Sequence, residues 1–554
     1  MDNNTLSPWK RFVRLVELER KDIYQIAYYA IFDGLVSLSL PLGIQAIINL
    51  LQGAQISTSW IVLVSLVTAG VAFSGILRLM QMRIIETIQQ RIFTRASLDL
   101  SYRFPKIKMS KLHDFYLPEL ANRFFDTIVI QKGLSKILID MPSALLQIIF
   151  ALILLSFYHP FFIIFGILLL MLIYVVFKYT AKRGLETSLN ESKHKYKVAH
   201  WLQEIARTII SFKLSGKTSL AMDKSDNLVS GYLESRENHF KILVMQFIQL
   251  IGFKVLVTLG LLVIGGLLVL DQRMNIGQFV AAEIIILLII TSVEKLISGL
   301  ESFYDVLTSI EKLGQIVDMP IEAQQGEKTQ NNSSLSIEFQ NVTYQVEKRY
   351  KPILSNISFC IEPKDHLLIK GESGAGKSSL LQLISGLVSP TSGYIYVNNL
   401  SIQSLFKNEY RSNLGVSLSE ETPFEGTIRE NITFGNKNIS DDTIYEVIES
   451  LNLTTFLHQQ IKGLSTILKP EGKQIAYTTS KKIILARALV KKPKLLILED
   501  PLDHFDKEEA TTIMNLLVAP EQPWSLVVVS NNDIWESKCN KQIILKKGVI
   551  VNKL

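Results

Sequence analysis

The segment 371–379 carries the residue types and the spacing of a phosphate-binding loop. It reads Gly371-Glu372-Ser373-Gly374-Ala375-Gly376-Lys377-Ser378-Ser379, which fits the pattern of a glycine, four free positions and then Gly-Lys-Ser. The glycines allow successive backbone N–H groups to turn inward around a phosphate chain. Lys377 can reach the terminal phosphates, and the Ser378 hydroxyl can ligate Mg²⁺. The segment therefore predicts a cradle for a nucleoside triphosphate and its magnesium ion.

The sequence on either side of this loop supports the match. Residues 366–370 (His-Leu-Leu-Ile-Lys) have the composition of a short buried strand, and residues 379–384 (Ser-Leu-Leu-Gln-Leu-Ile) that of a helix with one apolar face. A strand, a loop and a helix thus follow in the order that a phosphate site requires. The alternative interpretation is a Gly-Ser turn that binds no ligand.

Length and composition indicate a membrane protein of several domains. The chain has 554 residues, too many for one hydrophobic core, and its mean hydropathy of +0.25 is high for a soluble protein. Its two cysteines, Cys360 and Cys539, give no disulfide framework, and no Cys or His spacing typical of a metal site occurs. The net charge of +7 fits a membrane-orientation signal better than nucleic-acid binding, so we expect no nucleic-acid partner.

Long apolar runs predict about six membrane-spanning helices, because each run has close to the roughly 20 residues that cross a bilayer. The runs are 26–51, 59–82, 138–158, 161–179, 242–270 and 276–297. The short connections within each successive pair of runs contain Arg273 as their only basic residue, whereas the long segments 83–111 and 182–213 are rich in lysine and arginine. The positive-inside rule therefore places both termini and the phosphate loop in the cytoplasm. We expect a multi-pass protein of the inner (plasma) membrane.

Two polar features of the membrane half leave alternatives open. Residues 8–16 interleave apolar and basic side chains, as an N-terminal helix in the headgroup region would, but an ordinary amphipathic helix has the same pattern. Ionisable residues also lie in or at the ends of the apolar runs, where charge is costly. They are Asp33, Lys254, Glu283, Glu294 and Lys295. A substrate-cavity role for Glu283 or Lys254 competes with pairing between helices and with snorkelling at the membrane edge.

A change of pattern near residue 330 predicts a domain boundary. Residues 324–334 are polar and typical of a linker. Residues 335–339 (Leu-Ser-Ile-Glu-Phe) alternate as a strand does, and the remainder alternates short apolar strands with helical stretches, which predicts an α/β domain. We therefore expect an N-terminal interfacial helix at 1–20, a membrane domain at 21–325 and a nucleotide-binding domain at 335–554.

This order of parts resembles the ABC exporters of the half-transporter type, and the resemblance covers essentially the whole chain. Four further stretches carry it, each similar to a family motif. They are 424–432 (after the glutamine loop), 483–489 (the helix after the signature sequence), 494–500 (the Walker B strand) and 119–126 (the coupling region of secretion-type exporters). The resemblance implies a polytopic α-helical membrane domain followed by a C-terminal α/β P-loop domain of the ABC type.

The same resemblance implies cofactors and partners. The cofactors would be ATP and Mg²⁺, bound at 371–379. The partner would be a second copy or another ABC half-transporter, in contact with membrane lipids, and a periplasmic adaptor is an optional further partner in this family.

Three catalytic positions of the family carry other residues in this chain. Ser419 falls where the family has its glutamine, Asp500 follows Glu499 where the family has Asp then Glu, and Asn531 falls at the switch histidine. Asp500 is one methylene shorter than the glutamate that polarises the attacking water, and Asn531 cannot carry a charge or shuttle a proton as histidine can. Ser378 and Glu499 would still hold Mg²⁺, the latter through water. A register shift of one residue, or a strand that simply ends in surface carboxylates, is the competing interpretation.

Two further motifs also depart from the family. The signature Leu-Ser-Gly-Gly-Gln falls on 475–479 (Ile-Ala-Tyr-Thr-Thr), so that Tyr477 brings a bulky side chain where close backbone approach to a phosphate is wanted. The adenine-stacking aromatic falls on Val346, for which Tyr344 or Tyr350 could substitute. The phosphate loop alone keeps the family pattern.

These features together predict an ATP-binding subunit that exports a lipid, a peptide or a hydrophobic small molecule with weak or absent hydrolysis. If the partner subunit had intact motifs, each of the two nucleotide sites of the dimer would still contain an altered motif from this chain, and in a homodimer each site would contain altered motifs from both subunits. A bound nucleotide can nevertheless favour a closed state without being cleaved. The alternative is a non-transporting membrane protein whose nucleotide domain is a regulatory or scaffolding module. Substrate-stimulated hydrolysis that is lost in Lys377→Ala would favour the first, and a nucleotide-dependent partner interaction without turnover the second.

Overall fold

A computed structural model of the chain describes residues 6–52, 58–113, 115–328, 334–347 and 349–553. These residues form two compact units, one within 1–105 and 115–319 and the other within 106–114 and 320–554. Residues 1–5 of the predicted N-terminal helix and residues 329–333 of the predicted linker lie outside the described residues.

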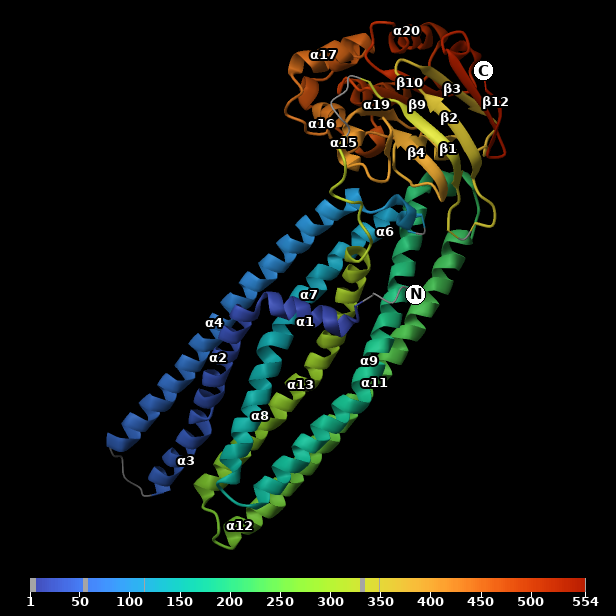
Figure 1. The fold of residues 1–554 in the computed structure, drawn as a ribbon. Coiled ribbons are helices and arrows are strands. Elements are labelled where there is room, and N and C mark those ends of the chain that lie inside the picture. The colour runs from blue at the N-terminus through green and yellow to red at the C-terminus, as the bar shows by residue number, and fades with distance from the viewer. Residues whose placement is uncertain (1–5, 53–57, 114, 329–333, 348, 554) are drawn as a thin grey trace. The chain divides into compact units, whose positions relative to one another are not determined.

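The first unit is a bundle of long helices (Figure 1). Among the described residues, six helical segments are long and apolar enough to cross a membrane, which confirms the predicted number of spans. They are Arg20–Gln52, Thr58–Lys106, Leu117–Ser156, Phe162–Arg207, Leu220–Leu270 and Ile276–Val317. The last span is the most buried, with half of its apolar window inside the unit against 28% or less for the other five.

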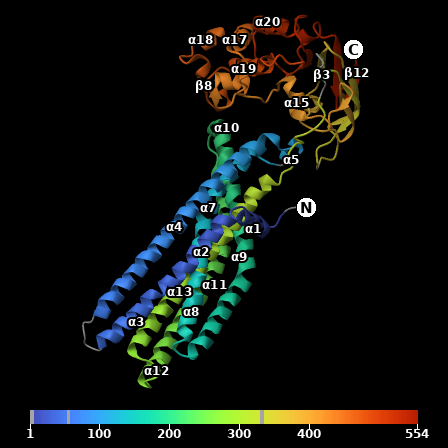
Figure 2. The same ribbon diagram turned by 60° about the vertical axis from the view of Figure 1, so that its left-hand side comes forward.

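The bundle is built from helices that follow one another with few breaks. They are α1 (Pro8–Leu18), α2 (Arg20–Ser37), α3 (Ser39–Gln52), α4 (Thr58–Arg103), α6 (Leu117–Asn122), α7 (Asp126–Ser135), α8 (Met141–Ser156), α9 (Phe161–Arg207), α10 (Ile209–Leu214), α11 (Leu220–Gly260), α12 (Gly266–Leu270) and α13 (Ile276–Val317). Turns of π-helix at Lys136–Asp140 and Leu261–Gly265 join α7 to α8 and α11 to α12. Helices α9 and α11 run side by side in both views (Figures 1 and 2).

Most charges inside the spans are paired between helices. Asp33 on α2 is 1% exposed and accepts hydrogen bonds from Ser74 and from Arg78, both on α4, the latter over 3.1 Å. Lys254 on α11 pairs with Glu294 on α13 at 3.2 Å. Glu283 on α13 is exposed, and the described residues offer it no recorded partner. The pairing interpretation therefore holds for Asp33 and Lys254.

The second unit is an α/β fold built on three sheets. Its largest sheet has the strand order β12-β11-β3-β10-β9-β6, in which all neighbours are parallel except β11 and β12. Its strands are β3 (His366–Gly371), β6 (Leu414–Ser417), β9 (Leu495–Glu499), β10 (Ser525–Val529), β11 (Lys541–Lys546) and β12 (Val549–Lys553). Successive residues of β9 alternate between two cores, with Ile497 in one and Leu496 in the other, because side chains of a strand point to opposite faces.

Two smaller sheets and a set of helices complete this unit. An antiparallel sheet has the order β2-β1-β4-β5, and β7 pairs with β8. Their bounds are β1 (Ile337–Tyr344), β2 (Leu354–Ile361), β4 (Ser392–Val397), β5 (Leu400–Ser401), β7 (Gly426–Thr427) and β8 (Ile467–Leu468). The helices are α14 (Lys377–Ile384), α15 (Lys407–Ser412), α16 (Ile428–Thr433), α17 (Asp441–Ser450), α18 (Thr454–His458), α19 (Tyr477–Leu489) and α20 (Lys507–Leu517).

The short segment 106–114 belongs to this second unit although it lies far from it in sequence. Ile107 forms an antiparallel bridge with Ile321, and the Lys108 N–H donates to the Pro320 carbonyl at 3.0 Å. Met109, at the start of α5 (Met109–Leu112), packs against the apolar core of the antiparallel sheet. The segment is thus anchored by both backbone and side-chain contacts.

Candidate nucleotide-binding site

The phosphate loop connects β3 to α14, in the order that the sequence predicts. Gly374 and Gly376 have φ of +78° and +100°, a region that side chains with a Cβ rarely adopt. A Cβ on Gly376 would lie 2.7 Å from Leu354 Cδ2, and one on Gly371 would lie 2.4 Å from the Leu545 carbonyl oxygen. These glycines are therefore required by the backbone path, and they leave the N-terminus of α14 open to an anion.

Lys377 lies folded over the loop that it belongs to. Its Nζ donates to the carbonyl oxygens of Gly371 at 2.6 Å and Glu372 at 3.1 Å. The ammonium group is thus held at the rim of the cradle, where it can move onto phosphate oxygens with little rearrangement.

Glu499, at the end of β9, joins the hydroxyl of Ser378, the predicted magnesium ligand, to that of Ser419, which falls at the position of the family's glutamine. Its Oε1 accepts from Ser378 Oγ at 2.5 Å, and its Oε2 accepts from Ser419 Oγ at 3.0 Å and from the Ser419 N–H at 3.2 Å. Glu499 is only 8% exposed, so it is not a surface carboxylate. Two hydroxyls and a carboxylate that converge in this way fit a hard cation such as Mg²⁺, completed by water and phosphate oxygens.

Asp500 follows directly and occupies an unusual backbone conformation. Its φ is +43°, and its N–H donates to the Val529 carbonyl at 2.8 Å. Burial raises the pKa of this carboxyl to about 6, with smaller contributions from the nearby charges of Asp503 and Glu499. The pKa of this carboxyl is thus closer to neutral than that of an ordinary aspartate.

Asn531 also lies at the loop, but it acts as a hydrogen-bond acceptor. Its Oδ1 accepts from the Gly371 N–H at 3.3 Å. The structure therefore brings Ser419, Glu499 and Asn531 to one site with the phosphate loop, as the motif register predicts.

Lys481, which the sequence analysis did not single out, reaches the same site from α19. Its Nζ donates to the Ser419 carbonyl at 2.6 Å. Burial lowers the pKa of Lys481, and the carboxylates of Glu421, Glu499, Asp503 and Asp500 oppose that shift. One helical turn earlier, Tyr477 is 53% exposed and packs edge-on against His504, with ring centroids 5.1 Å apart.

Of the two tyrosines considered as adenine partners, Tyr350 alone is accessible. Tyr344 is 6% exposed within the apolar core, and Val346 packs against the same core. Tyr350 is 95% exposed, so its ring is available for stacking.

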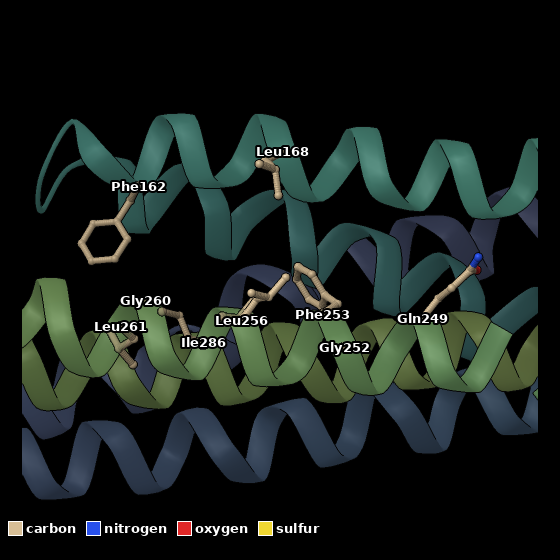
Figure 3. A pocket seen from close by; sticks show the side chains of 10 residues that line it. Phe162, Leu168, Gln249, Gly252, Phe253, Leu256, Gly260, Leu261 and Ile286 are labelled. Carbon is tan, nitrogen blue, oxygen red and sulfur yellow. The ribbon is translucent and has the colours of Figure 1, made fainter. Parts of the chain in front are cut away.

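The membrane unit contains a cavity of about 460 Å³ between α9, α11 and α13 (Figure 3). Its lining is apolar except for Gln249, and includes Phe162, Phe253 and Ile286. Gly252 and Gly260 on α11 open its wall, since a Cβ on either would meet nothing within 4 Å. This cavity can hold an apolar group of modest size.

Six apolar spans joined to an α/β unit with a phosphate loop define a multi-pass membrane protein with a nucleotide-binding domain. The family model for the ABC transporter transmembrane region matches residues 26–293, and a second family model, for the ABC transporter, matches residues 354–503. The chain therefore belongs to the ABC transporters, as a half-transporter of the exporter type. It is a protein of the inner membrane with its C-terminal ATP-binding domain on the cytoplasmic side.

Individual relatives agree with this family. The alpha-hemolysin translocation ATP-binding protein HlyB of Escherichia coli is 25% identical over 335 residues, which are 59% of this chain and 46% of that protein. The leukotoxin translocation ATP-binding protein LktB of Mannheimia glucosida is 26% identical over 362 residues, which are 64% of this chain and 50% of that protein. The chain thus spans about half the length of the curated relatives it matches.

A solved structure shares the fold over nearly the whole chain. It is described as a bacterial Atm1-family ABC exporter with ATP bound, and it superimposes with a TM-score of 0.83 at 17% identity, covering 97% of this chain and 96% of that one. At this level of identity the similarity establishes the fold alone.

Proposed function

We propose that this chain binds Mg-ATP through residues 371–379 and works as one half of a dimeric exporter whose closure is driven by nucleotide binding, with slow or absent hydrolysis. The observation that carries the proposal is a complete phosphate cradle beside Asp500. The cradle has the required glycine conformations and a Ser378–Glu499–Ser419 cluster that suits Mg²⁺. The side chain of Asp500 is one methylene shorter than the glutamate that the family has at this position.

The test is ATP binding and ATP hydrolysis by the full-length protein in lipid nanodiscs. Lys377→Ala should weaken Mg-ATP binding by about tenfold or more, because it removes a charge that contacts phosphates. Lys437→Ala, an exposed lysine of the same unit, is the matched control and should bind as wild type. Asp500→Glu should raise turnover by about tenfold or more by restoring the reach of the base.

Two outcomes would overturn the proposal. Robust wild-type turnover that Asp500→Glu does not increase would mean that hydrolysis is intact. Nucleotide binding that is insensitive to Lys377→Ala would mean that the loop is not the site. A nucleotide-dependent partner complex without any transport would instead favour the regulatory or scaffolding alternative.

For the transported molecule, the apolar cavity supports a lipid or a hydrophobic small molecule over a charged peptide. Gly260→Leu would place four carbons in the cavity and should reduce labelling by an apolar photoreactive probe in proteoliposomes by several-fold. Gly75→Leu is the matched control, because Gly75 also faces open space but does not line the cavity. Equal labelling of both variants would argue against this cavity as the substrate path.

A further inference from the structure

A second cavity in the membrane unit combines apolar and cationic side chains. It measures about 450 Å³ and lies between α1, α4, α7 and α13. Leu15 and Leu18 of α1, Ile92 of α4 and Leu313 of α13 contribute apolar surface, and Arg14 and Arg95 contribute guanidinium groups. An amphipathic cavity of this kind suits a ligand that has both an anionic and an apolar part.

Among the residues that the structure describes, three of the four charged side chains in the lining form ion pairs. Arg11, Arg95 and Asp99 each pair with a residue outside the lining. The partners are Glu311 and Asp318 for Arg11, Glu19 for Arg95 and Arg103 for Asp99. Arg14 is exposed, and the described part of the chain offers it no recorded hydrogen bond or ion pair. Within the described part of the chain, the guanidinium of Arg14 is therefore a positive charge in the lining that no recorded acidic group compensates.

The position of the cavity along α13 places it at the cytoplasmic edge of the headgroup layer. Ile310, in its lining, lies 34 residues after Ile276 at the outer end of α13, which is about 51 Å at 1.5 Å per residue. With a tilt of about 20–30° this corresponds to about 44–48 Å along the membrane normal for Ile310, which is the α13 lining residue nearest the membrane and lies at the edge of the 40–45 Å thickness of a bilayer with its headgroups. Trp9 on α1 is 55% exposed, as expected of an aromatic residue in that layer.

We propose that this cavity binds an anionic phospholipid of the cytoplasmic leaflet, with its phosphate on Arg14 and its apolar portion against Leu15, Leu18 and Ile92. Arginine is well suited to phosphate because its N–H groups match the oxygens in pairs. Basic pockets between membrane helices on the cytoplasmic side favour anionic headgroups. This site is separate from the apolar cavity and from the nucleotide site, and goes beyond the proposed export function.

The bound lipid would hold α1 against α13. Arg11 already crosses from α1 to Glu311 at 3.2 Å, and it occupies the space above Gly314, where a Cβ would come within 2.3 Å of Arg11 Nη1. Phe12 of α1 packs edge-on against Phe303 of α13. A lipid beside these contacts would stabilise the docked position of α1.

The test is binding of phosphatidylglycerol to the full-length protein, measured by native mass spectrometry after titration in mixed micelles, with phosphatidylcholine as the zwitterionic reference. Arg14→Gln should weaken phosphatidylglycerol binding by about fivefold, the effect of one basic group near an anionic headgroup. Arg14→Lys, which keeps the positive charge, should retain most of the affinity for phosphatidylglycerol. Lys10→Gln removes the same charge from the same helix at an exposed position outside the lining, and it should bind within about twofold of wild type.

Filling the cavity supplies an independent variant. Ala96→Phe should reduce phosphatidylglycerol binding without changing any charge, because Ala96 is part of the lining. Equal losses in Arg14→Gln and Lys10→Gln would show a diffuse basic surface and overturn the proposal. Equal binding of the two lipids, or full competition by free glycerol phosphate, would overturn it as well.

Discussion

At the scale of single residues, the raised pKa of Asp500 has a consequence for stability. The pKa of this carboxyl is about 6 in the folded protein, against about 3.9 in an unfolded chain. Between pH 4 and 6 the folded state therefore binds more protons than the unfolded state, so this group makes stability fall as pH rises through that window. The ionised carboxylate therefore lowers the stability above pH 6, whereas below pH 4 the group is protonated in both states and has little effect on stability.

Asp500→Asn should consequently stabilise the protein most at high pH. Two pKa units correspond to almost 3 kcal/mol, and because the group is only partly buried we expect on the order of 1 kcal/mol at pH 7.5. Thermal unfolding of the ligand-free protein should show the gain, and the gain should shrink by about half at pH 5. Asp442→Asn, an exposed carboxylate in the same unit, should show no such change between the two pH values. A pH-independent gain in Asp500→Asn would contradict the assignment.

Lys481 gives a second prediction at this scale, because it ties α19 to the backbone of Ser419. Lys481→Met keeps the apolar stem and loses this hydrogen bond, and we expect a loss of about 1 kcal/mol in unfolding free energy. If Lys481 also positions Ser419 for Mg²⁺, the increase in Tm that Mg-ATP produces should shrink in the variant. A variant with a lower Tm but an unchanged response to Mg-ATP would reduce Lys481 to a purely structural contact. Lys473→Met, exposed and nearby in sequence, is the control.

The site could be predicted from sequence where its residues are consecutive or lie at fixed distances from a motif. The phosphate loop is one continuous segment, and Ser419, Asp500 and Asn531 follow from counting along three motifs. Lys481 could not be found in this way, since it lies 62 positions after Ser419 in the sequence and belongs to none of the motifs. The one available signal was its place on α19 one turn after Tyr477.

At the scale of elements, the pair between α2 and α4 predicts an asymmetric response to mutation. Asp33 is 1% exposed and Arg78 is 50% exposed. Arg78→Gln would leave a buried carboxylate without its cation, which should cost about 3 kcal/mol. Asp33→Asn should cost only about 1 kcal/mol, because the amide can still accept from Ser74 and the remaining arginine can reach the headgroups.

Unfolding of the two variants and of the double variant in detergent would measure this difference. The double variant should recover most of the loss seen in Arg78→Gln, since it removes the unpaired charge. A loss in Asp33→Asn as large as that in Arg78→Gln would show instead that the geometry of the pair, and not the buried charge, stabilises the two helices.

The existence of the spans could be predicted from hydropathy, but their full length could not. The run 59–82 became α4, which extends to Arg103, and the run 161–179 became α9, which extends to Arg207. Hydropathy detects only the part of each helix that lies in hydrocarbon. Outside the hydrocarbon region the same helices continue as polar helices that are stabilised by packing. Composition alone does not distinguish such helical extensions from loops.

At the scale of the whole molecule, the residues of the nucleotide site predict a separation of binding from turnover. A ligand shifts a two-state equilibrium by the difference between its affinities for the two states, whether or not it is cleaved. A dimer of this chain would keep the phosphate cradles and lose the signature glycines and the catalytic glutamate. Closure of the two nucleotide domains should therefore follow Mg-ATP binding. It should also persist, because we propose that ATP hydrolysis, which would allow the domains to reopen, is slow or absent in this chain.

Distance measurements between spin labels would test this in the reconstituted protein. One label per chain at Lys437, in a background where Cys360 and Cys539 are serine, reports the separation of the two nucleotide domains. Mg-ATP and a non-hydrolysable analogue should give the same closed population, and it should remain for many minutes. Lys377→Ala should prevent closure, because the phosphates lose their cation, and Asp500→Glu should close and then reopen as ADP accumulates. Reopening of the wild type on the timescale of seconds would show that Asp500 completes the hydrolytic site after all, and the chain would then operate as a conventional exporter.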